Sequence, residues 1–295
     1  MKEAYGYLLI VVASLLWGTM GVLGKLAFEY GINPVTLTAL RLLISSLTIL
    51  VPILLSKKES FRIYKKDLSQ FLVLGIFAIA LQRIAYFYAV NLTTATIAAI
   101  LFYMYPIFIT IYCASMLKEK VTLPIVFAII LTFSGVALVV KIYEAASLST
   151  SFVGIVFGML SSVLFALYFL TVKKLRSHYA NWTLMLYGDG IGAAVLAPVI
   201  ASTFSEILSF SPQLWLIILT IAWFPSLLAY FIYSHALKHV ESSKGSILSA
   251  IEPLSAAVFS ATILRENFEL LQVVGVILAL TGVIVLFYKP KFKIR

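Results

Sequence analysis

The feature that most constrains this chain is a series of ten apolar segments separated by short polar connections. About 20 predominantly apolar residues in a helix suffice to cross the hydrocarbon core of a bilayer. The sequence therefore predicts an all-α polytopic membrane protein with ten transmembrane helices. Their expected ranges are 5–26, 34–55, 67–90, 94–116, 122–142, 152–172, 181–203, 211–236, 243–264 and 269–288. The break near residues 91–94 is either a tight turn or a kink.

The composition excludes the common alternatives to a membrane protein. Only 12% of the residues are charged, whereas a soluble domain carries about 25%. The net charge of +10 would suit nucleic acid, but the polar surface is too small for a soluble basic domain, so no nucleic-acid partner is expected. The single cysteine, Cys113, rules out a disulfide within the chain, and no metal-ligand spacing is present, so neither a metal nor a cofactor is expected.

Basic residues assign a side of the membrane to each connection, because cytoplasmic connections are enriched in Lys and Arg. With the N-terminus in the cytoplasm, 17 of the 22 basic residues fall at cytoplasmic ends. Only Lys25, Lys141 and Arg265 fall at outer ends. The sequence thus predicts a multi-pass protein of the cytoplasmic membrane, surrounded by the lipid bilayer, with both termini in the cytoplasm.

The two halves of the chain repeat one another. At an offset of 147, residues 88–140 match residues 235–287 at 13 of 53 positions, and Pro106 falls on Pro253. Each half has five predicted spans, an odd number, so the second half enters the membrane upside down. Inverted repeats are a hallmark of secondary transporters. The alternative is a duplication that only builds a stable bundle.

Several motifs lie at matching places in the two halves. The first span contains "LLWGTMGVLGK", the fourth has "YPIF" followed by "LKEKVTL", and the ninth has "EPLSA" followed by "LRENFELLQVVGVILALTGV". In these motifs the chain resembles EamA-type members of the drug/metabolite transporter superfamily, although "YGDG" in the seventh span departs from the family pattern. The resemblance implies two EamA-like five-helix repeats, 1–146 and 147–295. It also implies a transporter, often an exporter of amino acids or other small metabolites.

Four charged residues lie inside predicted spans: Arg41, Arg83, Asp189 and Glu252. A charge near the bilayer centre costs at least about 2.5–3.5 kcal/mol, so such a residue usually faces a cavity or a partner. One interpretation is a polar pathway in which the arginines attract a carboxylate or phosphate and the acids attract an amine. The alternative is that the four residues pair with one another and only hold the bundle together.

Pro106 and Pro253 mark the middle of the fourth and ninth spans. A proline lacks the N–H that would bond the carbonyl four residues earlier, here that of Phe102 or of Ser249. Irregular backbone at membrane depth persists only where protein or a water-filled cavity satisfies it. We therefore predict two kinks beside one central cavity, although tolerated kinks without a cavity would give the same sequence. The repeat equivalent of Glu252 is Tyr105, so the two halves offer the cavity a carboxylate and a phenol.

Aromatic residues are abundant in the spans expected around this cavity. Stacking on an apolar, flat or cationic substrate is one role for them, and packing is the other. The candidates are Trp17, Tyr86, Tyr88, Tyr103, Tyr105 and Tyr233.

The predicted function is alternating-access secondary transport. The sequence contains no GxxxxGK[ST], HExxH or GxSxG motif, so an enzyme is not expected. The expected cargo is a small amphipathic metabolite such as an amino acid, transport is proton-linked or uncoupled, and the chain acts as a monomer or homodimer. The alternatives are a channel-like facilitator, a carrier of sugars, nucleotide-like or drug-like molecules, and a membrane-embedded enzyme or scaffold.

Overall fold

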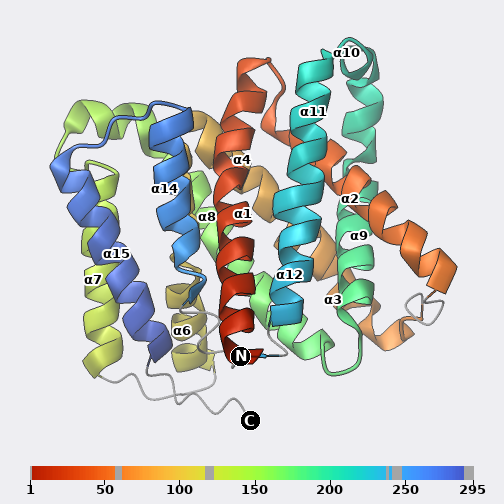
Figure 1. Ribbon diagram of the computed structural model, residues 1–295, viewed down its shortest axis with the longest axis horizontal. Helices are drawn as coiled ribbons and strands as arrows, with labels where there is room; N and C mark the ends of the chain where they lie inside the picture. Colours follow the sequence, from red (N-terminus) through yellow and green to blue (C-terminus); the bar gives the residue numbers. More distant parts are fainter. Residues whose placement is uncertain (1, 57–61, 117–122, 237–238, 241–247, 289–295) are drawn as a thin grey trace.

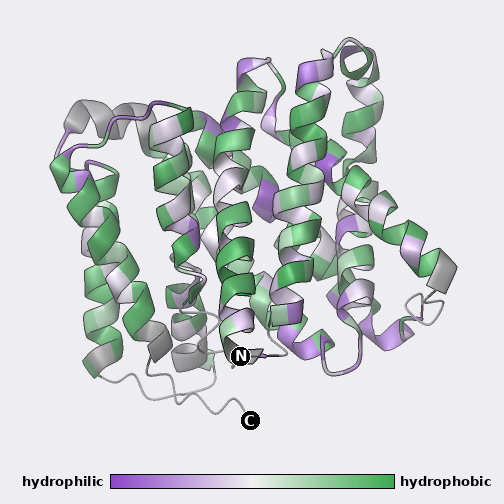
Figure 2. Cartoon of the chain, in the orientation of Figure 1, coloured by the Kyte–Doolittle hydropathy of each residue, from purple (hydrophilic) through white to green (hydrophobic). Residues whose placement is uncertain are grey.

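The computed structural model describes residues 2–56, 62–116, 123–236, 239–240 and 248–288. Within these ranges every regular element is a helix, and the helices stand side by side in one bundle (Figure 1). Hydrophobic residues dominate the middle of the helices, and hydrophilic residues gather toward their ends (Figure 2). The apolar middle of each helix suits the hydrocarbon core of a bilayer. The helical conformation suits it as well, because a helix satisfies its own backbone hydrogen bonds.

The helices follow the predicted spans closely in both halves. The first half comprises α1 (Lys2–Glu29), α2 (Pro34–Ser56), η2 (Lys65–Asp67), α3 (Leu68–Val73), η3 (Leu74–Leu81), α4 (Gln82–Leu92), α5 (Ala95–Phe102), α6 (Tyr105–Met116) and α7 (Leu123–Val139). The second half comprises α8 (Ala145–Leu175), α9 (Asn181–Ser202), α10 (Phe204–Leu208), α11 (Pro212–Ile221), η4 (Ala222–Leu228), α12 (Ala229–Ala236), α14 (Ile251–Ile263) and α15 (Leu270–Tyr288).

The predicted fold class is confirmed. In the described part of the chain, seven helices are long and apolar enough to cross a membrane. Three shorter apolar helices lie at the fifth, ninth and tenth predicted spans: Ile125–Val139, Ile251–Ile263 and Leu270–Val285. The first residues of the ninth predicted span, 243–247, lie outside the described residues. The break near residues 91–94 is a turn, because α4 ends at Leu92 and α5 begins at Ala95.

Local sequence signals explain where the first two spans end and begin. Gly31 follows α1 with φ 84°, a left-handed conformation that glycine adopts without steric cost. The Asn33 side chain then accepts a 2.8 Å hydrogen bond from the Thr36 N–H, and Pro34 occupies the first helical position of α2. Gly31 therefore favours the end of α1, and Asn33 and Pro34 favour the start of α2.

The third and eighth spans each contain a π-helical segment that the sequence did not lead us to expect. The segment η3 lies between α3 and α4, and η4 lies between α11 and α12. Their first residues, Leu74 and Ala222, are 148 positions apart, which is the repeat offset at the front of the two halves. Single π-helical turns are often found at functional sites, and this pair lies at equivalent places in the two repeats.

The helix packing has the symmetry of the repeat. Helix α1 packs on α12 and α14. Its repeat equivalent, α8, packs on the equivalents of those two helices, which are α4 and the interrupted span formed by α5 and α6. Helix α2 packs on its own equivalent, α9, and α7 packs on α15. Figure 1 shows the α7–α15 pair at one edge of the bundle and α2 with α9 at the other. Exchanging the two halves therefore maps each of these contacts onto another or onto itself.

Candidate functional site

A cavity of about 470 Å³ lies in the bundle. Both halves line it, and most of its wall is aromatic or aliphatic. This size and lining are typical of a small-molecule site. Its lining residues are Trp17, Met20, Arg41, Gln82, Arg83, Tyr86, Phe102, Tyr103, Tyr105, Phe165, Tyr168, Phe169, Val172, Lys173, Arg176, Asn181, Leu184, Met185, Pro225, Tyr230, Tyr233, Ser234, Ser249 and Glu252.

The fourth span is interrupted beside this cavity, before the proline. Helix α5 ends at Phe102, and α6 begins at Tyr105. Pro106 cannot bond the Phe102 carbonyl, and the Ser162 hydroxyl of α8 donates to that oxygen at 3.0 Å instead. A side chain of the opposite half thus satisfies the backbone group that the proline frees.

The ninth span has a matching interruption. Ser249 and Ala250 form a turn before α14 begins at Ile251. The backbone angles of Ala250, φ −62° and ψ −8°, are close to those of its repeat equivalent Tyr103, φ −70° and ψ 0°. Here the Ser249 carbonyl, which Pro253 frees, accepts the Glu252 N–H at 2.9 Å. Each half therefore carries a short helix that starts within the membrane.

Glu252 lies in the first turn of α14, and its side chain lines the cavity. Among the described residues it forms no salt bridge. A carboxylate is favoured at a helix N-terminus, because the unpaired N–H groups there carry partial positive charge. The groups that line the cavity around it are aromatic and come from several helices: Trp17, Tyr86, Tyr103, Tyr105, Tyr230 and Tyr233. The site thus presents one acidic group within an aromatic wall.

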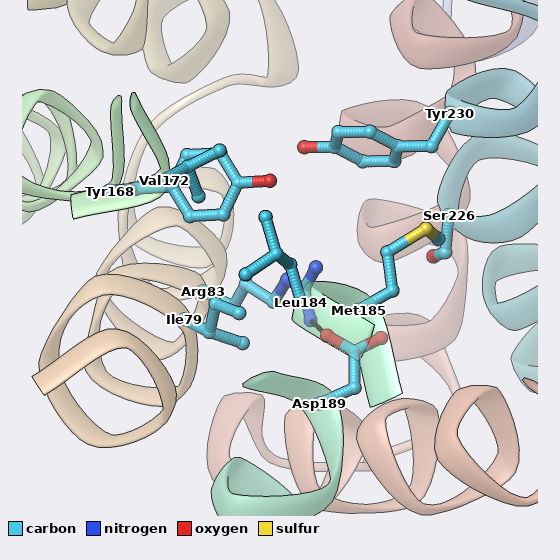
Figure 3. A pocket seen from close by; sticks show the side chains of 9 residues that line it. All are labelled: Ile79, Arg83, Tyr168, Val172, Leu184, Met185, Asp189, Ser226 and Tyr230. Atoms are coloured by element: carbon cyan, nitrogen blue, oxygen red, sulfur yellow. Dashed lines mark hydrogen bonds and ion pairs between the residues drawn. The ribbon is translucent and has the colours of Figure 1, made fainter. Parts of the chain in front are cut away.

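Arg83 and Asp189 form an ion pair next to the cavity. Arg83 Nη1 lies 2.7 Å from Asp189 Oδ1, and the two side chains are 12% and 6% exposed. The pair joins α4 of the first half to α9 of the second. It borders a small pocket of about 20 Å³, across which the hydroxyls of Tyr168 and Tyr230 point toward each other (Figure 3). This volume is enough for about one water molecule.

Arg41 is held by the second π-helical segment. Its Nε–H donates to Ser226 Oγ at 2.7 Å, and the Ser226 hydroxyl donates to the Ile221 carbonyl at 2.6 Å. Arg41 is 4% exposed, and within the described ranges it makes no salt bridge. Because only Nε is bonded to Ser226, the terminal amino groups remain for a guest with acceptor oxygens.

At one end of the bundle Lys25 of α1 binds the end of α4 and the turn that follows it. Its Nζ donates to the carbonyls of Val90 at 3.1 Å, Asn91 at 3.2 Å and Thr93 at 2.8 Å. These carbonyls belong to the end of α4 and the turn that follows. A cation is favoured there, because the last carbonyls of a helix carry partial negative charge.

Glu266, in the connection between α14 and α15, binds the other side of the same turn. Its carboxylate accepts the Ala95 N–H and the Thr96 hydroxyl, both at 3.2 Å, at the start of α5. We refer to the contacts of Lys25 and Glu266 with this turn as the clamp. The clamp ties α1 and the second half to the α4–α5 turn.

The cavity reaches the opposite end of the bundle. Its lining there includes Lys173 and Arg176 near the end of α8 and Asn181 at the start of α9. Lys173 and Arg176 are exposed and Asn181 is half-buried. The beginning of α1 lies at this end too (Figure 1). The cavity lining therefore reaches exposed residues at the α8–α9 end, which we call the open end, and includes none of the clamp residues at the other end, which we call the closed end.

The structure brings the predicted site residues together at this cavity. Trp17, Arg41, Arg83, Tyr86, Tyr103, Tyr105 and Glu252 line the large cavity, and Asp189 lines the small pocket beside it. Tyr233 lines the large cavity as well. Of the two roles considered for the aromatic residues, Tyr88 has the packing role, because its ring stacks on Phe157 at 4.8 Å and does not line the cavity.

Sequence reasoning missed several lining residues. Ser226 could have been noticed, because it follows Pro225 in an otherwise apolar run. Lys173 and Arg176 were assigned only to the cytoplasmic interface. Tyr168 and Tyr230 gave no signal beyond being aromatic, since a span of this composition does not reveal which face turns inward.

The helices and the cavity define a class: a multi-pass membrane protein with a cavity large enough for a small molecule. The EamA-like transporter family model matches the chain twice, over residues 4–141 and 152–288. The chain therefore belongs to the EamA-like transporter family. Each match contains five of the spans described above, so the second set crosses the membrane in the opposite sense to the first.

Similar proteins carry the same general description. An uncharacterized transporter of Archaeoglobus fulgidus is 28% identical over 95% of this chain and 96% of its own length. The uncharacterized transporter YetK of Bacillus subtilis is 27% identical over 98% of this chain and 89% of its own length. The uncharacterized inner membrane transporter YicL of Salmonella typhimurium is 25% identical over 98% and 97%. A crystal structure 18% identical to the chain shares the fold, with a TM-score of 0.65 over 96% of both chains.

Proposed function

We propose that this protein exports small amphipathic metabolites such as amino acids by alternating access. The moving halves are the repeats 1–146 and 147–295. One observation carries the proposal: a cavity lined by both repeats reaches exposed residues at one end, whereas hydrogen bonds of the clamp tie the helices together at the other end. Two inverted repeats that exchange conformations would open the blocked end and close the open one.

The orientation of the described state follows from the distribution of basic residues, whereas export rests on the resemblance to the transporter family. The open end carries Lys173, Lys174 and Arg176, which the positive-inside rule places in the cytoplasm. On this assignment the described state faces the cytoplasm of a cell membrane, ready to load an exported substrate, and both termini are cytoplasmic. The functional unit is a monomer or homodimer.

The substrate contacts follow from the chemistry of the lining. Arg41 offers charged N–H donors to a carboxylate, and Glu252 offers an acceptor to an amine. Trp17, Tyr86 and Tyr105 supply flat faces for the apolar part of the substrate. Because Glu252 has no basic partner among the described residues, it is also the group we assign to proton coupling.

Counterflow in proteoliposomes tests the proposal. Purified protein is reconstituted with one unlabelled metabolite inside, and uptake of the same labelled metabolite is followed for amino acids, sugars and nucleotide-like compounds. A carrier gives saturable uptake that an internal substrate accelerates. Uptake that does not saturate and does not respond to internal substrate would favour a channel-like facilitator and overturn alternating access.

A further inference from the structure

The charged side chains that line the large cavity do not balance. Arg41, Arg83, Lys173 and Arg176 are cations, and Glu252 is the single acid among the described lining residues. Asp189 neutralises Arg83 from the neighbouring pocket. The deep part of the cavity thus keeps one free cation and one acid, whereas the entrance keeps two cations.

We propose that this cavity selects guests that carry a net negative charge, presented as a carboxylate or phosphate oxyanion. Lys173 and Arg176 attract the guest at the entrance, and Arg41 binds its oxyanion in the interior. The inference rests on the proposed function, since it takes the cavity to be the transport pathway. It deepens that function, because among small amphipathic metabolites it favours those with a net negative charge over neutral zwitterions.

Arg41 is built to hold an oxyanion. Ser226 fixes the guanidinium through Nε, so the side chain does not have to be ordered when a guest binds. The guanidinium carbon lies 5.9 Å from the centre of the Phe87 ring, which packs beneath it. Guanidinium groups bind carboxylate and phosphate through parallel N–H donors.

Two further donors lie at the same cavity without acceptors. Trp17 Nε1 and the Tyr103 hydroxyl are buried, and neither has a hydrogen-bond partner within the described part of the chain. A buried polar group without a partner costs free energy. Both atoms are enclosed in this state, so a guest would recover that cost only if these two side chains moved.

The entrance provides a matched control. Lys173 and Lys174 are neighbours, both are exposed, and both suit a cytoplasmic membrane surface. Only Lys173 lines the cavity. A lysine that merely meets lipid headgroups would behave like Lys174, whereas a lysine that steers the guest would not.

The test measures the electrostatic potential of the cavity with thiol reagents and requires no known substrate. In full-length protein with Cys113→Ala, Ser234→Cys places a thiol on the cavity wall. The rate at which this thiol reacts is measured with two reagents, the anionic sulfonatoethyl and the cationic trimethylammonioethyl methanethiosulfonate. The ratio of the anionic to the cationic rate is then divided by the same ratio measured for the free thiol 2-mercaptoethanol, which corrects for the intrinsic reactivity of the reagents. A basic cavity raises this quotient about tenfold.

The variants locate the cause of the effect. Lys173→Gln and Arg41→Gln lower the quotient several-fold, high salt lowers it, and Lys174→Gln leaves it nearly unchanged. A quotient near one, or equal effects of Lys173→Gln and Lys174→Gln, would overturn the proposal. Because the reagents report on the cavity alone, this result is independent of whether counterflow succeeds.

Protection distinguishes the two oxyanions. Acetate and inorganic phosphate are compared as competitors of the anionic reagent at Ser234→Cys, with Arg41 intact and with Arg41→Gln. Stronger protection by one of them that disappears in Arg41→Gln identifies the oxyanion that Arg41 binds. Equal, weak protection that does not depend on Arg41 would contradict the role assigned to that residue.

Discussion

The two ends of the bundle place equivalent lysines in opposite situations. Lys25 and Lys173 are 148 positions apart and correspond in the repeat. Lys25 binds three carbonyls at the closed end, whereas Lys173 is exposed and lines the open cavity. The same residue in two copies of one unit thus has two environments. An inverted repeat whose halves exchange conformations would exchange these environments as well.

The largest expected effect lies midway between the two ends, at Glu252. We predict that Glu252→Gln abolishes transport or removes its pH dependence, because the variant keeps the shape of the side chain but loses its charge and its proton. Initial counterflow rates across a pH series measure the effect. Wild-type flux with an unchanged pH response would remove Glu252 from the mechanism.

A strong effect on stability is expected at the ion pair that joins the two halves beside the cavity, between the two ends. Arg83→Met leaves the buried Asp189 carboxylate without its cation and should cost about 3–5 kcal/mol. Thermal unfolding in detergent measures the loss. The double variant Arg83→Met with Asp189→Leu should recover most of it, and a double variant as unstable as the single one would argue against the pair as the cause.

A smaller effect is expected at the clamp. Lys25→Met removes the cation from the end of α4 and should raise the population open at that end about tenfold, or about 1.4 kcal/mol. The readout is labelling of Met20→Cys, in a Cys113→Ala background, by an impermeant maleimide added at the clamp end.

Lys141→Met is the matched control for the clamp. This half-buried lysine pairs with Glu269 and Glu144, and the hydrogen bond to Glu269 raises the pKa of Lys141 above its ordinary value. It does not touch the α4–α5 turn, so its loss should leave labelling of Met20→Cys unchanged. Equal labelling in Lys25→Met and Lys141→Met would mean that the clamp does not hold the end closed.

The smallest effect on stability is expected at the interruption of the fourth span, where a hydroxyl of the other half satisfies the freed carbonyl. Ser162→Ala deprives the Phe102 carbonyl of its hydroxyl donor and should destabilise the protein by about 1 kcal/mol. Ser161→Ala is the control, because that buried hydroxyl bonds within its own helix to Gly158. If the two variants unfold at the same temperature, the bond from Ser162 contributes nothing to the interruption.

Much of the fold could be predicted, because a bilayer limits the choices. The length of the apolar segments predicts the spans. Pro106 predicts the freed Phe102 carbonyl, because a proline has no N–H to bond it. The donor to that carbonyl could not be predicted. Ser162 reaches it only because α8 is rotated in one particular way, and a span that is apolar all round does not specify its rotation.

The same limit explains the results for the candidate site. Arg83 and Asp189 are two of the four charged residues that the sequence leaves free either to pair or to line a pathway. Only the three-dimensional packing shows that these two form an ion pair. For Tyr86 and Tyr88 the sequence left both substrate stacking and packing open. Residues two apart on a helix point about 200° from each other, so only one of them lines the cavity.

The central claim, that the two ends open alternately, is tested most directly by measuring both ends in one population of molecules. Spin labels at Asn91→Cys with Asn267→Cys report on the clamp end, and labels at Tyr5→Cys with Ser177→Cys report on the open end, all in a Cys113→Ala background. In Lys25→Met, we predict that the Asn91–Asn267 distance lengthens and the Tyr5–Ser177 distance shortens in equal fractions of molecules. Lengthening at the clamp end with no change at the open end would show a continuous pore and contradict the account.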